Sequence, residues 1–327
     1  MSKTYRLGVI GFAHMHVNTL LDYFAALPNV EWVACADTVP IVPTRSDARN
    51  TRRANLRRAH EHTGIPKIYR DYQDMLERER FDIVIFCPEN ARHAEVAEAI
   101  AAKGAHMLTE KPMAADLSGA LRMVRAARAN GVSLLVNWPT TWQPAIRKMK
   151  ALLDEGVIGE VLEVKWRNGG SMGPLPGEEI TDEQRGAEWW HQSAPGGGAL
   201  LDYCCYGACL ARWFIGEPAV AAIITVRFPK ALAILEGSWT TWNVGLPTGP
   251  IVYGAKGTLV VSRKLEDGQS MPVVEIYTSR GYSLIPPDEI VEGDPLPEGR
   301  TNIAEEFIHH LETGEPPHPT LEMGQNL

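Results

Sequence analysis

The stretch GVIGFAHMH, residues 8–16, decides the fold of the first half of the chain. It ends an apolar run at Gly11 and then places two histidines at alternate positions, His14 and His16. One interpretation is a His-x-His metal site at the end of a first strand. The other is a modified form of the glycine turn that seats a dinucleotide.

The metal interpretation asks for more ligands than this pair supplies. A His-x-His barrel site needs eight strand–helix units and further His and Asp ligands from later strands. The strand–helix rhythm stops near the middle of this chain, and the later histidines lie mostly at 191, 309, 310 and 318. We therefore expect no metal site.

The dinucleotide interpretation fits the position of Gly11. In a dinucleotide fold the first strand ends in a tight glycine turn, and the next helix presents free N–H groups to the pyrophosphate. Ala13 takes the place of the second glycine and is small enough to let phosphate approach. His16 replaces the third glycine and is a real departure. We expect Gly11, Phe12, Ala13 and His14 to contact the cofactor.

An acidic residue at the end of the second strand supports this interpretation. Asp37 ends VEWVACAD, 26 residues after Gly11, where a carboxylate accepts hydrogen bonds from the adenosine ribose. Its charge repels a 2′-phosphate, so NAD is favoured over NADP. An arginine cluster follows, and we expect it to be a solvated helix face, with a 2′-phosphate site as the alternative. Its members are Arg45, Arg49, Arg52, Arg53, Arg57 and Arg58.

The wider pattern predicts two domains. Strand-like and helical runs alternate through residues 1–137, which is typical of a Rossmann domain with a doubly wound parallel sheet. Residues 138–327 begin with a helix and continue in strand-like runs rich in Trp, Val and Thr. We expect an α+β domain there, with a large, mostly antiparallel sheet that binds substrate and forms oligomer contacts.

The composition excludes several classes of partner. A net charge of −8 disfavours nucleic acid, because phosphate binding needs a basic face. The chain shows neither an apolar run long enough for a membrane nor a signal peptide, so we expect a cytoplasmic protein. The five cysteines form no Cys-x-x-Cys pair and are expected to be buried reduced thiols.

Three segments make the interpretation specific. TEKPMA (109–114), CPENARHAEVA (87–97) and GGGALLDYCCYGACLARWFIGEP (196–218) resemble the Gfo/Idh/MocA family of NAD(P)-dependent oxidoreductases. VYGAKGTLVV (252–261) and EGSWTTW (236–242) resemble the sheet domain of that family. The run from Gly196 to Arg212 is most similar to the branch that contains glucose–fructose oxidoreductase and dimeric dihydrodiol dehydrogenase. The resemblance implies NAD, or NADP, as the cofactor.

Three residues carry the expected chemistry. Hydride transfer from a carbon that bears a hydroxyl needs a base for the hydroxyl proton. Lys111 ends a strand at the rim where such folds bind ligands. Asp202 and Tyr206 are spaced i, i+4, which places a carboxylate and a phenol on one helix face. The resemblance puts both beside the nicotinamide. The proton carrier is Tyr206 with Lys111 assisting, or Lys111 itself; the alternative for the pair is a helix cap and a core tyrosine.

The resemblance also implies further contacts. Cofactor contacts are expected from a loop against the ribose and nicotinamide and from the end of a later strand. These residues are Pro88, Glu89, Asn90, His93, Glu110 and Lys111. His93 opens a helix, so a structural or capping role is the alternative. Substrate contacts are expected from Trp166, Arg167 and His191, together with Asp202 and Tyr206. Tryptophans stack on sugar rings, although burial in a core or a subunit interface explains them equally well.

The leading hypothesis is therefore a dehydrogenase or reductase of a sugar, polyol or related cyclic alcohol. The second is a redox-neutral glycosidase or lyase that oxidises a sugar carbon transiently with bound NAD and releases no NADH. The third is a ligand-sensing relative without catalysis, against which Lys111, Asp202 and Tyr206 argue together. By resemblance we also expect a homodimer or homotetramer. The end of the chain, TLEMGQNL, falls where relatives usually continue into another helix, so two alternatives stay open: the sequence is incomplete there, or the domain junction is less supported.

Overall fold

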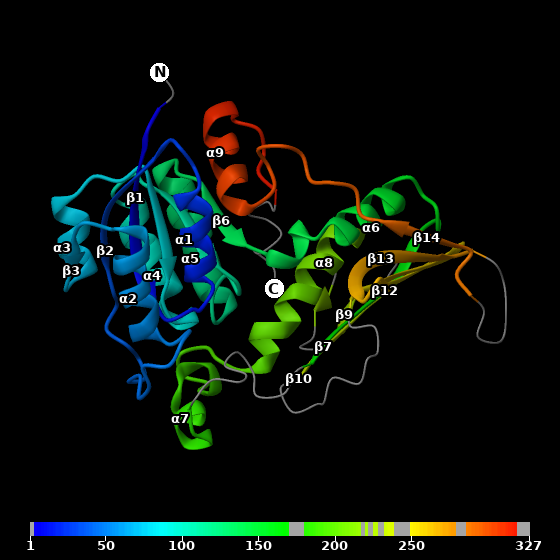
Figure 1. Cartoon of the computed structure of the whole chain (residues 1–327), viewed down its shortest axis with the longest axis horizontal. Coiled ribbons are helices and arrows are strands. Elements are labelled where there is room, and N and C mark those ends of the chain that lie inside the picture. The colour runs from blue at the N-terminus through cyan, green and yellow to red at the C-terminus, as the bar shows by residue number, and fades with distance from the viewer. Residues whose placement is uncertain are drawn as a thin grey trace. The chain divides into compact units, whose positions relative to one another are not determined.

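The computed structural model describes residues 3–169, 180–216, 220–221, 225–227, 232–238, 249–278 and 286–318 (Figure 1). These residues form two compact units, and each is treated separately below. The first unit takes its residues from 1–137, 173–201 and 299–327. The second takes its residues from 138–172 and 202–298.

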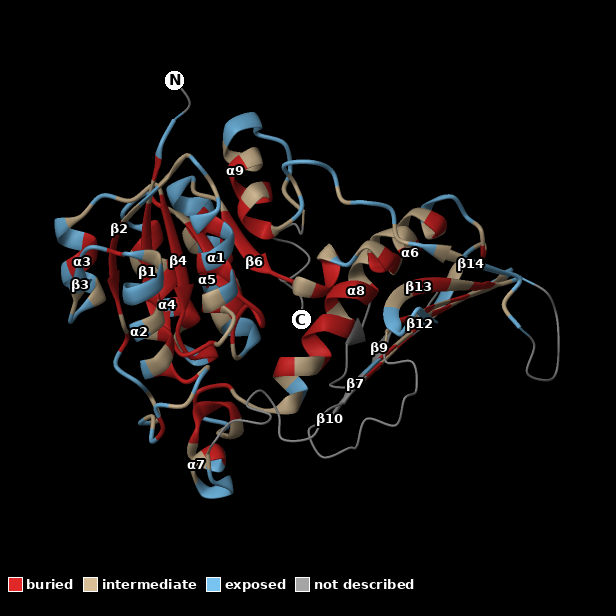
Figure 2. Ribbon diagram, viewed as in Figure 1, coloured by how far each residue is buried: buried red, intermediate tan, exposed pale blue. Residues whose placement is uncertain are grey.

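The first unit is built on a sheet of six parallel strands in the order β3-β2-β1-β4-β5-β6. The strands are β1 (Tyr5–Phe12), β2 (Val30–Ala36), β3 (Ile68–Tyr69), β4 (Ile83–Cys87), β5 (His106–Glu110) and β6 (Leu134–Asn137). Their runs of Val, Ile and Leu are buried nearly throughout, as Figure 2 shows for β1 and β4. Strand order reverses between β1 and β4, so the loops that follow these two strands meet at one edge of the sheet.

Two groups of helices cover this sheet. These helices are α1 (Val17–Ala25), α2 (Arg52–Thr63), α3 (Tyr72–Arg78), α4 (His93–Ala101), α5 (Leu117–Asn130) and α9 (Ile303–Thr313). The first unit also contains α7 (Asp182–Ala187), which packs against a 3₁₀ turn at Trp189–His191, and a further 3₁₀ turn at Asn90–Arg92. α1 packs against α2 and α9, while α4 packs against α3 and α5. Because right-handed crossovers on the two sides of a switch point lie on opposite faces, the predicted doubly wound sheet is confirmed.

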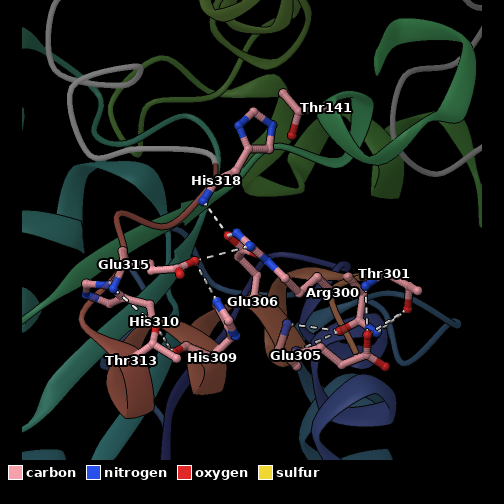
Figure 3. A network of polar contacts seen from close by, with 12 residues as sticks. Thr141, Arg300, Thr301, Glu305, Glu306, His309, His310, Thr313, Glu315 and His318 are labelled. Carbon is pink, nitrogen blue, oxygen red and sulfur yellow. Dashed lines mark hydrogen bonds and ion pairs between the residues drawn. The ribbon is translucent and has the colours of Figure 1, made fainter. Parts of the chain in front are cut away.

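The last described helix, α9, belongs to the first unit through a dense polar network (Figure 3). Arg300 donates two hydrogen bonds of 2.7 Å to the nearly buried carboxylate of Glu306. The Glu306 carboxylate also accepts from the backbone N–H of His318 at 2.8 Å. His310 Nε2 lies 2.8 Å from Ser133 Oγ, just before β6. The Glu306 contacts hold the C-terminal stretch to itself, whereas the His310–Ser133 contact and the packing of α9 on α1 join it to the rest of the first unit.

The second unit contains an eight-stranded sheet in the order β14-β13-β12-β11-β7-β10-β9-β8. Its strands are β7 (Val161–Gly169), β8 (Val220–Ala221), β9 (Thr225–Arg227), β10 (Leu232–Ser238), β11 (Ile251–Gly254), β12 (Gly257–Glu266), β13 (Gln269–Tyr277) and β14 (Glu289–Glu292). All recorded pairs are antiparallel except β7 with β10. The predicted mostly antiparallel sheet is therefore confirmed.

Helices cover this second sheet as well. α6 (Pro144–Asp154) packs against β12, β13 and β14, and α8 (Cys205–Ile215) packs against β7 and β10. A 3₁₀ turn at Pro139–Trp142 precedes α6, and a π-helical turn at Leu200–Cys204 precedes α8.

The two units bear on the predicted domain bounds, cysteines and membrane spans. The described second unit leaves out 173–201 and 299–327, which cluster with the first unit, so the functional domains 1–137 and 138–327 stay predictions. All five cysteines are buried, as predicted, and none forms a disulfide within the described residues. Among the described residues, no helix is long and apolar enough to cross a bilayer. The chain end TLEMGQNL and the end of EGSWTTW lie outside the described residues.

Candidate functional site

The turn at the end of β1, residues 11–16, begins at Gly11, whose backbone has a conformation that only glycine adopts comfortably. Gly11 has a φ of +80°, and a Cβ added there would lie 2.6 Å from Pro88 N, the residue that follows β4. Any side chain at this position would therefore be strained and would collide with backbone. The structure thus brings together two residues predicted to bind the cofactor, Gly11 and Pro88.

The other residues of the turn are held from distant parts of the chain. The indole N–H of Trp189 donates to Ala13 O at 3.0 Å, across 176 residues of sequence. Trp190 stacks on Trp189, and its ring meets the His14 ring edge-on with centroids 4.7 Å apart. His14 is consequently 1% exposed, and this burial lowers the pKa of its imidazole well below the usual value. These tryptophans pack on the turn itself.

His16 has a partner that the sequence did not reveal. Its Nδ1 lies 3.0 Å from Oε2 of Glu110, at the end of β5. Glu110 is completely buried; its Oε2 also accepts from the backbone N–H of Lys111, and its Oε1 accepts from Asn137 Nδ2 at 2.5 Å. The replacement for the third glycine therefore contacts the residue that the sequence predicted for the nicotinamide side.

Lys111 is nearly buried, with 2% of its surface exposed. It follows β5 directly, and its peptide bond with Pro112 is cis. Lys111 also interacts electrostatically with His14, which helps to lower the pKa of that histidine. The lysine and the glycine turn are thus neighbours at the carboxyl ends of the parallel strands, as the sequence predicts.

Asp37 lies at the end of β2 and accepts three hydrogen bonds on its Oδ1 atom. The donors are the backbone N–H groups of Phe12 (3.2 Å) and Thr38 (2.8 Å), and Arg52 Nη1 (2.5 Å). The Asp37 side chain is 22% exposed, so part of the carboxylate stays accessible for a ribose. Burial raises the pKa of Asp37, against the lowering effect of Arg52.

Arg52 corrects one expectation. The arginine cluster was expected to form a solvated helix face, but Arg52 is only 6% exposed. Its Nη2 lies 2.5 Å from Oε2 of Glu89, which is itself fully buried and accepts from the Ile41 N–H at 3.0 Å. Arg52 is therefore a buried counter-ion for two predicted cofactor residues, Asp37 and Glu89.

The loop after β4 is tied to the glycine run before α8. Asn90 Nδ2 donates to Gly196 O at 2.7 Å, and the Ala91 N–H donates to Pro195 O at 3.1 Å. His93, predicted to contact the cofactor or to cap a helix, is fully buried, and its Nδ1 lies 3.0 Å from Met113 O. Because a carbonyl only accepts, this nitrogen carries the hydrogen, and burial lowers the pKa of His93.

In the second unit, the predicted pair sits at the start of α8. Asp202 lies in the π-helical turn and Tyr206 in the first turn of α8, and they are 5% and 8% exposed. The Tyr206 ring lies between Trp138 and Trp166, with centroid distances of 6.5 and 6.2 Å. The change from π- to α-helix between the two residues means that the simple i, i+4 geometry does not describe them.

The predicted substrate residues differ in exposure. Trp166 is 7% exposed; its indole N–H donates to Tyr203 O at 3.1 Å, and its ring fills the space left by Gly207. Arg167 is exposed on β7. His191, in the first unit, is half-buried, which lowers the pKa of its imidazole. Their contacts with a substrate stay predictions.

The first unit fits a dinucleotide on its own geometry. Gly11 takes a positive φ where the chain leaves β1 and packs directly on the backbone of Pro88, so the ends of β1 and β4 lie close together, as a dinucleotide-binding turn requires. Helix α1 begins directly after this turn, and Asp37 keeps an accessible carboxylate at the end of β2. This is the arrangement that the pyrophosphate and ribose of NAD(P) require.

Comparison with known proteins agrees with this geometry. Residues 6–138 match the model of an oxidoreductase family with an NAD-binding Rossmann fold, and residues 146–282 match the Gfo/Idh/MocA C-terminal domain. A dTDP-3,4-didehydro-2,6-dideoxy-α-D-glucose 3-reductase of Actinomadura kijaniata is 30% identical over 251 residues, covering 76% of this chain and 68% of the relative. A myo-inositol 2-dehydrogenase of Thermotoga maritima is 27% identical, covering 86% and 83%.

Solved structures show the same fold. A levoglucosan dehydrogenase in complex with NADH and levoglucosan has a TM-score of 0.71 at 18% identity, covering 99% of this chain and 94% of that one. A biliverdin reductase of Synechocystis, bound to biliverdin and NADP⁺, has a TM-score of 0.72 at 15% identity, covering 98% and 95%. The relatives carry several activities, so they identify the family and not a branch within it. The chain belongs to the Gfo/Idh/MocA family and is an NAD(P)-binding oxidoreductase.

Proposed function

We propose that this protein transfers hydride between a nicotinamide and a hydroxyl-bearing carbon of a sugar, polyol or related cyclic alcohol. The observation that carries the proposal is the buried Lys111 at the end of β5, in a Rossmann unit whose glycine turn fits a dinucleotide. The names of the relatives support the substrate class, since they include sugar reductases and dehydrogenases of levoglucosan and myo-inositol.

The cofactor, when bound, supplies the hydride acceptor or donor. Gly11, Phe12, Ala13 and His14 would hold its pyrophosphate, and Asp37 its adenosine ribose. The Asp37 carboxylate disfavours a 2′-phosphate, so NAD is the proposed cofactor. Pro88, Glu89, Asn90, His93 and Glu110 would shape the wall toward the nicotinamide, directly or through the bonds described above.

Each catalytic candidate has a separate role. Lys111 and Tyr206 are the candidates for carrying the proton of the substrate hydroxyl, because an amine and a phenol both exchange protons with an alcohol. Asp202 would accept a hydrogen bond from a substrate hydroxyl. Trp166, Arg167 and His191 are the proposed specificity residues.

The test incubates the protein with NAD⁺ or NADP⁺ and a panel of sugars, polyols and glycosides. NADH absorbance and product release are followed together. Accumulation of reduced cofactor with one substrate class supports the proposal. Product release without NADH would instead indicate the redox-neutral lyase, and cofactor binding without any turnover would indicate a sensor.

Variants then assign the roles. Lys111→Ala is expected to abolish turnover while NADH still binds, as measured by its fluorescence. Tyr206→Phe removes the phenolic hydroxyl, and Asp202→Asn replaces the carboxylate with a neutral amide of similar size. Unchanged turnover in any of these three variants removes that residue from the mechanism.

A further inference from the structure

Three side chains of the first unit converge at the turn after β1, where the sequence analysis expected no metal site. Ligand atoms of His14, His16 and Glu110 all lie within 4.8 Å of one another. Two imidazoles and one carboxylate are the donor set of many zinc sites that keep an open position. We propose that these three residues bind one divalent transition-metal ion of the zinc type, which joins the turn after β1 to the end of β5.

The spacing of the donors supports this proposal. Two ligands about 2.1 Å from one tetrahedral ion are about 3.4 Å apart. His16 Nδ1 and Glu110 Oε2 are 3.0 Å apart, so an ion fits between them after a small displacement. His14 and Glu110 are buried, whereas the His16 side chain is 27% exposed and has room to adjust.

The surroundings of the donors also suit a bound ion. Asn137 Nδ2 donates to Glu110 Oε1 and leaves Oε2 directed at His16, which is how outer groups commonly orient a ligating carboxylate. Trp190 packs edge-on against the His14 ring and restrains it. His14 Nδ1 accepts the backbone N–H of His16 at 3.2 Å, which leaves the buried Nε2 as the nitrogen for an ion. Binding there moves the ring hydrogen from Nε2 to Nδ1 and gives up the contact with the His16 N–H.

Charge sets the class of ion. Lys111 interacts electrostatically with His14, so a cation here meets an unfavourable positive neighbour, which the Glu110 carboxylate offsets. Nitrogen donors favour Zn²⁺ or Co²⁺ over the oxygen-preferring Mg²⁺ and Ca²⁺. The site is therefore expected to select a late transition metal, and the proposal is independent of any step in hydride transfer.

Cobalt titration of the chelator-treated full chain tests the proposal, with no substrate or cofactor present. We expect one Co²⁺ per chain, visible ligand-field absorption, displacement by Zn²⁺ and no displacement by Mg²⁺. His16→Ala and Glu110→Gln should each lower the Co²⁺ affinity by at least ~10-fold, and Asn137→Ala by about 10-fold.

The chain supplies its own control. His60 and His62 form a second His-x-His pair, exposed on α2, and His60→Ala/His62→Ala should leave Co²⁺ binding unchanged. Circular dichroism checks that each variant is folded, and the part-exposed His16 keeps the test valid if a variant of buried His14 is unstable. Absence of saturable binding, wild-type affinity in His16→Ala, or equal competition by Mg²⁺ would overturn the metal site. NADH binding, measured separately, shows whether the cofactor proposal stands on its own.

Discussion

Arg52 and Asp37 form an ion pair in which Nη1 lies 2.5 Å from Oδ1, although 15 residues separate them. The other terminal nitrogen of the same guanidinium, Nη2, lies 2.5 Å from Oε2 of Glu89. One arginine thus connects the acidic residue after β2 with the loop after β4. Two carboxylates of the cofactor region share a single buried counter-ion.

Arg52→Ala should therefore destabilise the protein strongly. The change leaves the fully buried Glu89 without its cation, and removal of one partner from a buried pair costs about 3–5 kcal/mol. Urea denaturation measures the loss. Arg53→Ala is the matched control, because Arg53 is 64% exposed and pairs with Asp47 at 3.6 Å; it should change stability by less than about 0.5 kcal/mol. If both variants lose the same free energy of unfolding, the buried ion pair of Arg52 stabilises the protein no more than the exposed pair of Arg53 does.

Gly11→Ala tests the turn that fits the pyrophosphate. The added methyl group would lie 2.6 Å from the backbone of Pro88, and alanine is also strained at the positive φ of this position. Both the stability and the NADH affinity of the variant should therefore fall. Gly64→Ala isolates the conformational part, since Gly64 has a φ of +69° and nothing within 4 Å of the added Cβ. That control should lose about 1–2 kcal/mol and no NADH affinity. Thermal unfolding and NADH fluorescence titration give the two readouts, and identical behaviour of both variants contradicts the steric argument.

Acid should destabilise the first unit through its buried histidines. Burial lowers the pKa of His14 and of His93 from the ordinary value of 6.5, so the folded state binds fewer protons than the unfolded state below that pH. The two neutral histidines contribute their full stabilisation above about pH 6.5. This stabilisation is lost as the pH falls from 6.5 toward their lower pKa values in the folded state. Each histidine adds a slope of at most about 1.4 kcal/mol per pH unit.

His93→Gln should reduce the change of the free energy of unfolding per pH unit by the contribution of one histidine, because glutamine does not titrate. Denaturation at a series of pH values between 5 and 8 measures it, with His62→Gln on the exposed surface of α2 as the control. A slope that is the same in His93→Gln and in the wild type would remove His93 from the explanation.

Gly207→Ala probes the second unit. A Cβ at Gly207 would lie 2.6 Å from the Trp166 side chain, so α8 and β7 must separate or the indole must move. We expect a loss of about 1–3 kcal/mol, the usual cost of overpacking, and a shift in tryptophan fluorescence. Gly186→Ala, also helical but with open space around its Cβ, should be neutral or slightly stabilising. An unchanged emission spectrum in Gly207→Ala would contradict the close packing.

Periodicity in the sequence predicted most of the first sheet correctly. The runs YRLGVIGF (5–12), VEWVACAD (30–37), FDIVIFCP (81–88), AHMLTEKP (105–112) and VSLLVNW (132–138) predict strands, and they contain β1, β2, β4, β5 and β6. Such apolar runs can be recognised without tertiary information. β3 and α3 were not predicted, because a two-residue strand and a seven-residue helix are too short to show a period. α9 was also not predicted, although its apolar positions have helical spacing.

The sequence predicted residues of the candidate site but not which of them contact one another. Gly11, Asp37 and Lys111 could be named from local patterns. The contact between His16 and Glu110 spans 94 residues, and a linear pattern carries no signal for it. Arg52 was misjudged for a similar reason: a polar, Arg-rich helix suggests a solvated face, and only the fold shows which of its arginines turns inward.

The Rossmann unit is assembled from three separate stretches of the chain, the last of which carries α9 against α1. The chain is synthesised from its N-terminus, so the first strands are made long before α9, which lies near the C-terminus. The packing of the Rossmann unit is therefore incomplete until α9 has been synthesised. Stalled translation products that end before residue 303 are therefore expected to leave the apolar side of α1 uncovered and to attract chaperones or proteases.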